Sequence, residues 1–254
     1  MEIRFDEKVV LVTGASRGIG KAMAIQFANA GARVAAHYNS NHEAAKSLLK
    51  ILPGHGHACL PADLALPAEI EKLAGSVLRK FGRIDILVNN AAVFEEQEMA
   101  SMTFNSFREY WDHTISVNLS GPAFISHLVS RQMVKQGGGK IVNISSRGAF
   151  RGEPDAWAYG ASKAGLNSLG QSMAKALAHY GISVYTLAPG FVETDMARSC
   201  MKGRRRADLL SQSPLNRIAQ PDEIARAVLM LCAEGNEYMT GCIVDMNGAS
   251  YLRS

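Results

Sequence analysis

The chain has 254 residues, of which 47% are hydrophobic and 20% charged, as in an ordinary globular protein. Its net charge of +4 is small and its basic residues are dispersed except at Arg204, Arg205 and Arg206, which argues against a nucleic-acid partner. No apolar run approaches the roughly 18 residues of a membrane span, and acidic residues stand near the start, where a secretory signal is basic. The four cysteines lack CxxC spacing. We therefore expect a cytoplasmic protein with free thiols and no membrane contact.

Short apolar runs, mostly rich in Val and Ile, recur along the chain and predict strands. Their lack of apolar/polar alternation indicates that both faces are buried, as in a parallel sheet covered by helices. The predicted strands cover residues 8–14, 32–38, 56–63, 83–92, 139–146, 182–190 and 241–248. Helical patterns lie between them, over residues 18–31, 42–52, 67–82, 104–136, 159–177 and 220–235. This alternation predicts an α/β fold, a doubly wound parallel sheet (Rossmann-like) in three layers, forming a single domain over residues 1–254.

One connection, residues 193–214, is too long for a tight loop. Long connections at the carboxyl ends of strands often cover active sites, so we interpret this segment as a mobile lid. The alternative is a variable surface excursion with no role in a site.

The first predicted strand runs into a glycine-rich turn, Thr13-Gly14-Ala15-Ser16-Arg17-Gly18-Ile19-Gly20, and then into a helix. Glycines let backbone N–H groups and the positive helix N-terminus come close to a pyrophosphate. A glycine-rich turn alone is a weak signal, but its position between the first strand and the first helix of an α/β pattern indicates a dinucleotide site.

The second predicted strand ends in His37-Tyr38-Asn39-Ser40, without the carboxylate that often binds the adenosine ribose in this kind of fold. No carboxylate would therefore repel a 2′-phosphate there, and Arg17 can offer that phosphate a charge-assisted hydrogen bond. These two features favour NADP(H) over NAD(H). The alternative for Arg17 is a solvated arginine at a helix start.

Tyr159 and Lys163 stand four residues apart in a helical pattern, so their side chains should share one helix face. A nearby ammonium favours the phenolate form of a tyrosine, whose ordinary pKa is about 10. Lowering that pKa to about 7 needs roughly 4 kcal/mol, which Lys163 and a cationic nicotinamide ring together can supply. Taken alone, the pair is more often a stacked tyrosine beside a solvated lysine. No metal site is expected, because His55 and His57 lie in a Gly/Pro-rich turn without further ligands at metal spacing.

Six motifs in order resemble the motif series of the short-chain dehydrogenase/reductase family. They are TGASRGIG, Asn89-Asn90-Ala91-Ala92, Asn118 in SVNLSG, Ser146 in IVNISS, Tyr159-Gly160-Ala161-Ser162-Lys163, and Pro189-Gly190 followed by Thr194. The resemblance extends from Lys8 to the closing DMNGASYL, and in appearance it is closest to the 3-oxoacyl-[acyl-carrier-protein] reductases. One departure is Ala92, which stands where the family usually has glycine.

The resemblance implies catalytic roles. Tyr159 would give a proton to the substrate carbonyl as hydride arrives from the nicotinamide, and Lys163 would lower the pKa of Tyr159 and hold the nicotinamide ribose. Ser146 would hydrogen-bond the substrate oxygen, with Ser145 as its rival by adjacency. Asn118 would anchor a proton-relay water through a local helix distortion; the alternative is a helix-interior asparagine bonded only to backbone.

The same resemblance implies the cofactor contacts. The turn would contribute Gly14, Ser16, Arg17, Gly18, Ile19 and Gly20, and the second strand Asn39 and Ser40. Asp63 and Leu64 would lie at the adenine, and Asn90 and Ala91 at the adenosine ribose. Tyr159 and Lys163 would share the nicotinamide end with Pro189, Gly190, Val192 and Thr194.

The leading substrate is a 3-oxoacyl thioester, and the pocket wall is expected from Val93, Phe94, Phe150, Trp157 and Phe191 beside Arg151 and Glu153. Docking of an acyl carrier protein stays open, because Gly137 and Tyr180 stand where such reductases often have arginines, while Arg204 to Arg206 could meet an acidic carrier or be a solvated face. A dehydrogenase of a sugar, polyol or other ketone is the first alternative, and a catalytically silent dinucleotide sensor or interaction protein is the second. Helices near residues 120–136 and 157–179 carry apolar and small residues on more than one face, which predicts a homotetramer or homodimer.

Overall fold

A computed structural model describes residues 3–194 and 203–253, with side chains described from residue 206 onward in the second range. Within these residues the strands form one seven-stranded sheet in the order β3-β2-β1-β4-β5-β6-β7, with every neighbouring pair parallel. The strands are β1 (Val9–Val12), β2 (Arg33–Tyr38), β3 (Ala58–Pro61), β4 (Ile86–Asn89), β5 (Gly139–Ile144), β6 (Ile182–Pro189) and β7 (Ile243–Met246). The prediction of a doubly wound parallel sheet is confirmed.

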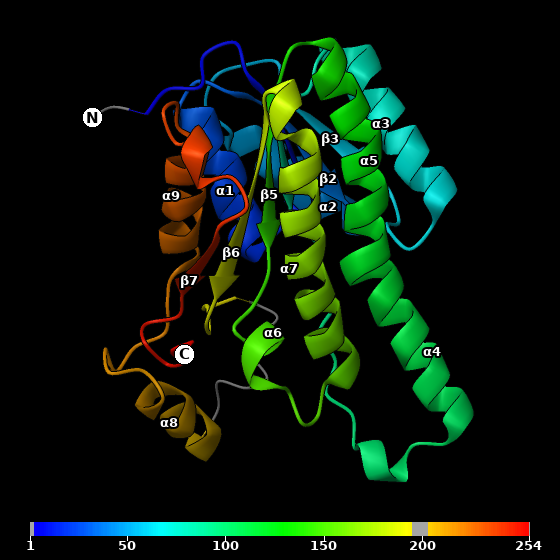
Figure 1. Cartoon of the computed structure of the whole chain (residues 1–254), viewed down its shortest axis with the longest axis vertical. Coiled ribbons are helices and arrows are strands. Elements are labelled where there is room, and N and C mark those ends of the chain that lie inside the picture. The colour runs from blue at the N-terminus through cyan, green and yellow to red at the C-terminus, as the bar shows by residue number, and fades with distance from the viewer. Residues whose placement is uncertain (1–2, 195–202, 254) are drawn as a thin grey trace.

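Helices cover both faces of the sheet, so the molecule has three layers (Figure 1). They are α1 (Gly18–Asn29), α2 (His42–Ile51), α3 (Pro67–Phe81), α4 (Phe104–Ile115), α5 (Gly121–Lys135), α6 (Gly148–Arg151), α7 (Trp157–Leu177), α8 (Gly203–Ser211) and α9 (Pro221–Cys232). One apolar core joins α1, α2 and α9 to one face of the sheet, and a second core joins α3, α5 and α7 to the other. Because the strands β1, β4, β5 and β6 are almost entirely buried, their unbroken apolar runs are explained by burial on both faces.

The helix predicted over residues 104–136 is interrupted. Between α4 and α5, residues Ser116–Ser120 form a π-helical turn in which Gly121 N–H donates to the Ser116 carbonyl. Gly121 is needed at this point, because a Cβ there would lie 2.7 Å from the Leu64 carbonyl oxygen. The helix axis is therefore disturbed where α5 crosses the segment that follows β3.

The lid predicted at residues 193–214 lies partly outside the described residues, which stop at 194 and resume at 203. Its second half contains the helix α8, which the sequence analysis did not predict. Leu209 of α8 is buried, whereas Arg206 and Asp208 are exposed. Because Leu209 is a single buried apolar residue on a mostly polar helix, the sequence of α8 shows little of the apolar periodicity that predicts a helix.

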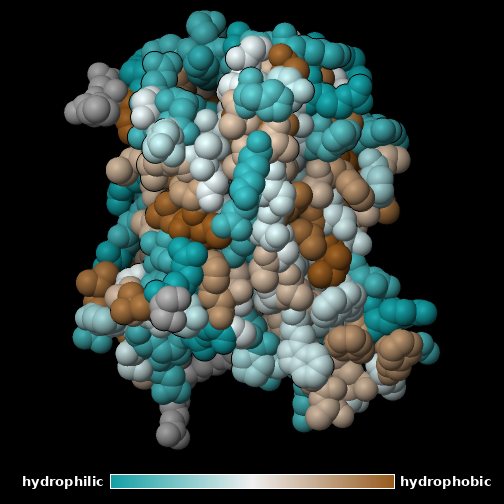
Figure 2. Space-filling view, in the orientation of Figure 1, coloured by the Kyte–Doolittle hydropathy of each residue, from teal (hydrophilic) through white to brown (hydrophobic). Residues whose placement is uncertain are grey.

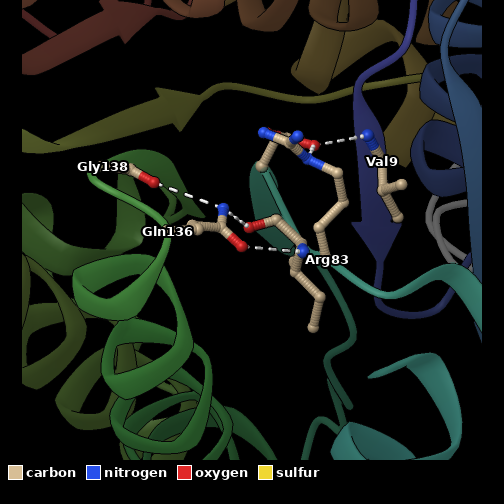
Figure 3. A network of polar contacts seen from close by, with 6 residues as sticks. Val9, Arg83, Gln136 and Gly138 are labelled. Carbon is tan, nitrogen blue, oxygen red and sulfur yellow. Dashed lines mark hydrogen bonds and ion pairs between the residues drawn. The ribbon is translucent and has the colours of Figure 1, made fainter. Parts of the chain in front are cut away.

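At the amino-terminal edge of the sheet a polar network joins three segments (Figure 3). Asp85 accepts hydrogen bonds from Val9 N–H at 2.8 Å and from the Arg83 guanidinium at 2.6 Å. Gln136 at the end of α5 binds the backbone of Ile84 through both its amide nitrogen, at 2.7 Å, and its amide oxygen. This network fixes the edge of the sheet that lies opposite the site described below.

None of the described helices combines the length and the apolar character needed to cross a membrane.

Candidate active site

A cavity of about 730 Å³ lies at the carboxyl ends of the strands. In the sheet, β2 and β3 extend from one side of β1, and β4 to β7 extend from the other. The direction in which strands are added therefore reverses between β1 and β4, and ligands usually bind at the carboxyl ends of the strands beside such a point. Its lining runs from the glycine-rich turn and the end of β2 to Ser146, Tyr159 and Lys163. All the residues predicted to bind cofactor line this cavity.

The glycine-rich turn is shaped by close backbone approaches. Gly14 and Gly18 have positive φ angles of 64° and 54°, which L side chains rarely adopt. A Cβ on Gly20 would lie 2.2 Å from the Gly14 carbonyl oxygen and 2.7 Å from the Asn90 amide nitrogen. The turn can therefore fold back on the start of α1 only with glycine at this position.

Side chains from β1 and β4 hold the turn in place. The Thr13 hydroxyl accepts hydrogen bonds from Asn90 N–H at 2.9 Å and Ala91 N–H at 3.0 Å. The Asn90 amide in turn donates to the carbonyls of Thr13 and Gly14. The predicted residues Asn90 and Ala91 are thus joined to the turn, and Ala92 fits beside them on the cavity wall.

His37 is a residue whose part in the site the sequence analysis missed. It is buried at the end of β2, where its Nδ1 accepts a hydrogen bond from Gly14 N–H at 3.0 Å and its Nε2 lies 2.9 Å from the Ala62 carbonyl oxygen. Accepting at Nδ1 requires a proton on Nε2, which then donates to Ala62. Burial lowers the pKa of His37 and so favours this neutral form. Nothing in the residue spacing indicates this bond between the end of β2 and the glycine-rich turn.

The adenosine end of the cavity combines exposed and polar groups. Arg17, Asn39 and Ser40 are exposed and line it, and Asp63 lies half-buried after β3 with its carboxylate accepting from Ala65 N–H at 2.9 Å. Arg17 is the N-cap residue of α1 without a capping side-chain bond, and the first turn of α1 has no acidic residue. The helix N-terminus is therefore free to bind an anion, and these residues together fit a dinucleotide with its phosphates at the turn.

Tyr159 and Lys163 share one face of α7, and Ser146 follows β5 opposite them. The Ser146 hydroxyl lies close enough to Tyr159 to lower the pKa of that phenol, and it accepts from Gly148 N–H at 3.0 Å. The rival Ser145 instead donates to the Lys163 carbonyl at 3.3 Å. Geometry therefore brings Ser146, not Ser145, to the tyrosine hydroxyl.

The pKa of Tyr159 in the protein without cofactor is raised, whereas the sequence predicts that Lys163 and a cationic nicotinamide ring lower it together. Burial raises it, the hydrogen bond from Ser146 opposes this, and the charge of Glu153 raises it further. The Lys163 ammonium donates to the Ile144 carbonyl at 2.8 Å and lies 5.7 Å from the centre of the Tyr159 ring. Burial lowers the pKa of Lys163 itself to about 8. In this arrangement Tyr159 is a protonated phenol, the form that can donate a proton.

Asn118 lies in the π-helical turn and does not line the cavity. Its side chain accepts from Val93 N–H at 2.8 Å and donates to the Val93 carbonyl at 2.9 Å. The next residue, Phe94, packs edge-on against the Tyr159 ring at 4.9 Å between centroids. The Asn118 amide also donates to the Ser162 hydroxyl at 3.3 Å, so it is not bonded to backbone alone. Its bonds to Val93 hold the segment that packs on Tyr159, and the predicted helix distortion is present as the π-helical turn.

The segment after β6 closes the other side of the cavity. Gly190 N–H donates to the Met246 carbonyl at 3.0 Å, and a Cβ on Gly190 would lie 2.9 Å from Asn247 Cα. A Cβ on Gly18 would meet the Thr194 side chain at 3.2 Å, so Thr194 lies against the glycine-rich turn. Pro189, Gly190, Val192 and Thr194 therefore reach the same cavity as the turn, as predicted for the nicotinamide end.

The predicted substrate wall is only partly correct. Val93, Phe94, Phe191, Arg151 and Glu153 line the cavity. Two aromatics do not: Trp157 is exposed and packs on Phe107, and Phe150 lies under the Arg253 guanidinium at 4.5 Å. The wall also contains Arg147, which the sequence analysis did not single out.

These features define a class of protein. The profile of a family described as Enoyl-(Acyl carrier protein) reductase matches residues 14–248, and this match, with the sheet order and the Ser146-Tyr159-Lys163 arrangement, shows that the chain belongs to the short-chain dehydrogenase/reductase family. It is therefore an oxidoreductase that uses a nicotinamide dinucleotide to interconvert a carbonyl group and an alcohol in a small molecule.

Individual relatives cover almost the whole chain. The 3-oxoacyl-[acyl-carrier-protein] reductase FabG of Thermotoga maritima is 37% identical over 97% of this chain and 98% of its own length. The protein of the same name from Escherichia coli K12 is also 37% identical, over 98% of this chain and 100% of its own.

Solved structures agree with the fold. A dehydrogenase/reductase from Sinorhizobium meliloti 1021 has a TM-score of 0.90 at 29% identity and covers 99% of this chain and 98% of its own. A candidate NAD(P)-dependent gluconate 5-dehydrogenase from Beutenbergia cavernae, with NADP bound at low occupancy, has a TM-score of 0.89 at 28% identity and covers 98% and 99%.

Proposed function

We propose that the protein is an NADP(H)-dependent reductase whose leading substrate is a 3-oxoacyl thioester. The observation that carries this proposal is one continuous cavity, with Arg17 and the glycine-rich turn at one end and Ser146, Tyr159 and Lys163 at the other. A hydride donor and a proton donor would thus face the same small space. Bound NADP(H) supplies or accepts the hydride.

The catalytic steps proposed for this chain follow from its contacts. The Ser146 hydroxyl donates a hydrogen bond to the substrate carbonyl oxygen, and the Tyr159 phenol, kept protonated by burial, donates its proton to that oxygen. Lys163 presents a buried ammonium beneath the Tyr159 ring and would also hold the nicotinamide ribose. Asn118 keeps Phe94 against the tyrosine, which excludes water from one side of the ring. Support for an additional proton-relay role of Asn118 comes from the π-helical turn in which it lies.

The proposal of NADP(H) rests on the end of β2 and on Arg17. The end of β2 and the residues from Asn39 to His42 contain no carboxylate, while Arg17 lies exposed on the same cavity wall as Asn39 and Ser40. A 2′-phosphate would therefore meet a cation and neutral donors. The Beutenbergia cavernae structure with NADP supports the same choice.

The thioester substrate is proposed from the two FabG relatives. Carrier-protein docking is the less supported part, because Gly137 and the exposed Tyr180 stand where such reductases often have arginines. The gluconate 5-dehydrogenase neighbour favours a sugar or polyol dehydrogenase as the second candidate. A silent sensor is disfavoured because it would need only the cofactor half of the cavity, whereas Ser146 and Tyr159 are also in place.

We also infer a homodimer or homotetramer. Apolar and near-neutral residues follow the face formed by α7, α5 and α4 (Figure 2), and Phe104, Phe124 and Trp157 on these helices are exposed. Contiguous exposed apolar surface of this kind marks protein–protein contacts. A role of residues 193–214 as a lid is proposed from α8, whose Asp208 and Leu209 line the cavity.

A cytoplasmic location stays a prediction from the cysteine pattern; Cys59, Cys232 and Cys242 are free thiols.

The test is NADPH oxidation with a small 3-oxoacyl thioester. Tyr159→Phe keeps the ring contact with Phe94 but removes the proton donor, so kcat should fall by at least about 100-fold, while the Kd of NADPH changes by less than about threefold. Tyr180→Phe, at the far edge of the sheet, is the matched control. A Tyr159→Phe enzyme that keeps kcat within about tenfold of the wild type would show that another group donates the proton. Wild-type turnover of ketosugars but not of thioesters would favour the second candidate.

A further inference from the structure

Arg147 is the most deeply buried charged residue of the cavity wall apart from Lys163. It directly follows Ser146, only 4% of its surface is exposed, and its backbone N–H donates to the Pro189 carbonyl at 2.9 Å. Its guanidinium lies over the Phe191 ring at 4.4 Å from the centroid. The cation is therefore fixed between the proposed catalytic serine and the segment that follows β6.

Within the part of the chain that the structure describes, no carboxylate forms an ion pair with Arg147. Its Nη2 donates to the Gln212 side-chain oxygen at 2.6 Å, and its buried Nη1 has no hydrogen-bond partner in the described part of the chain. Arg151 donates to the same Gln212 oxygen at 3.2 Å. Two guanidinium groups thus share one neutral acceptor, and burial together with the charge of Arg151 lowers the pKa of Arg147 to about 10.

Glu153 lies near the two arginines without neutralising them. Among the described residues, no carboxylate comes within ion-pair distance of Arg147 or Arg151. The Glu153 carboxylate instead lies over Gly148, where a Cβ would be only 2.6 Å from its oxygen. Burial raises the pKa of Glu153, so this carboxyl is a poorer counterion than an exposed one.

We propose that Arg147, assisted by Arg151, binds an anionic group of the substrate, so that the substrate is a ketone or secondary alcohol bearing a carboxylate or a phosphate. This inference rests on the proposed function, because it names the substrate class of the same cavity. A carboxylate or phosphate oxygen would give Nη1 its missing partner and would reduce the repulsion between the two guanidiniums. The phosphate of a phosphopantetheine thioester and the carboxylate of a free oxo acid are the two sources of this chemistry.

The experiment compares kcat/KM for three 3-oxobutanoyl substrates with NADPH. The N-acetylcysteamine thioester is neutral, the 4′-phosphopantetheine thioester carries a phosphate, and acetoacetate carries a carboxylate. For the wild type, one anionic substrate should exceed the neutral thioester by at least about tenfold, the effect expected of one hydrogen bond to a charged group. Which anion is preferred identifies the source. If kcat/KM for the neutral thioester equals that for both anionic substrates, the proposal is wrong while the proposed reductase function stands.

Variants identify the group responsible. Arg147→Met should reduce the ratio of anionic to neutral kcat/KM by at least about tenfold, and Arg147→Lys should restore part of it. Glu153→Gln should raise that ratio, because a competing negative charge is removed. Arg79→Gln, an exposed arginine on α3, is the matched control and should leave the ratio unchanged. If Arg147→Met lowers kcat/KM for all three substrates equally, Arg147 is a structural residue and the inference is wrong.

Stability provides an independent measurement. An unpaired buried charge opposes folding, so Arg147→Met should unfold at the same temperature as the wild type or at a higher one. With NADP⁺ saturating, malonate or inorganic phosphate at constant ionic strength should raise the Tm of the wild type but not of Arg147→Met. A lower Tm for Arg147→Met, or equal anion effects in both proteins, would contradict an anion site. Should Arg147→Met fail to fold, the ratios measured for Arg151→Gln and Glu153→Gln decide the question in the same way.

Discussion

Asn118 offers a quantitative test of how the site is held together. Asn118→Ala removes both hydrogen bonds to Val93 and leaves the N–H and carbonyl of that half-buried residue without a partner. At about 1–3 kcal/mol for each unsatisfied group, discounted for partial access of water, we expect a loss of about 3 kcal/mol in the free energy of unfolding. For a chain of this length that is roughly 6–12 °C in Tm. Because Phe94 is then free to leave Tyr159, kcat/KM for the ketone should also fall.

The assay is thermal unfolding at one fixed protein concentration, combined with kcat/KM and the Kd of NADPH. Asn118→Asp should be no better than Asn118→Ala, because a carboxylate can accept from Val93 N–H but repels the Val93 carbonyl. Asn167→Ala is the matched control: this buried asparagine of α7 has a side-chain oxygen without a partner, so we expect a loss of at most about 1 kcal/mol. Equal Tm values for Asn118→Ala and Asn167→Ala would refute the role of Asn118 in holding Val93.

Two further predictions concern charge. Arg17→Ala should weaken the binding of NADPH by at least about tenfold and that of NADH by less than about twofold, because only NADPH has a 2′-phosphate. Fluorescence titration measures both Kd values, and equal values for the two cofactors in the wild type would refute the NADP(H) proposal. The kcat/KM for NADPH reports ionisations of the free protein and should fall as pH rises through about 8. The reason is that Lys163 has a lowered pKa of about 8 and is charged only below that pH, whereas Tyr159 has a raised pKa and stays protonated there. A profile that stays level to pH 9.5 would mean that the charge of Lys163 is not required.

The strands and the edge at which the site lies could be predicted from the sequence, because burial on both faces gives each parallel strand an unbroken apolar run. The resemblance to the family predicts that Gly14, Asn90, Ser146 and Gly190 share one site, and the carboxyl ends of parallel strands, which meet at one edge, explain this grouping. The glycine-rich turn could also be predicted, because Gly20 has no room for a Cβ and its partner in that contact, Gly14, lies in the same short motif.

What could not be predicted depends on contacts between distant segments. The raised pKa of Tyr159 follows first from its burial, and the Lys163 ammonium is held by the Ile144 carbonyl of another element. The part played by His37 needs the Gly14 N–H, and the missing partner of Arg147 is visible only when Gln212 is placed beside it. Residue spacing gives no information about any of these three arrangements.

The bond between His37 and Gly14 constrains how the cofactor preference of this enzyme could be redesigned. A common strategy introduces an aspartate at the end of the second strand to bind the ribose of NADH. Aspartate at His37 would remove the acceptor ring nitrogen and place a carboxylate in a buried position, which would release the glycine-rich turn that every nicotinamide dinucleotide needs. Asn39 is exposed on the same cavity wall and leaves the turn untouched, so engineering toward NADH should begin there.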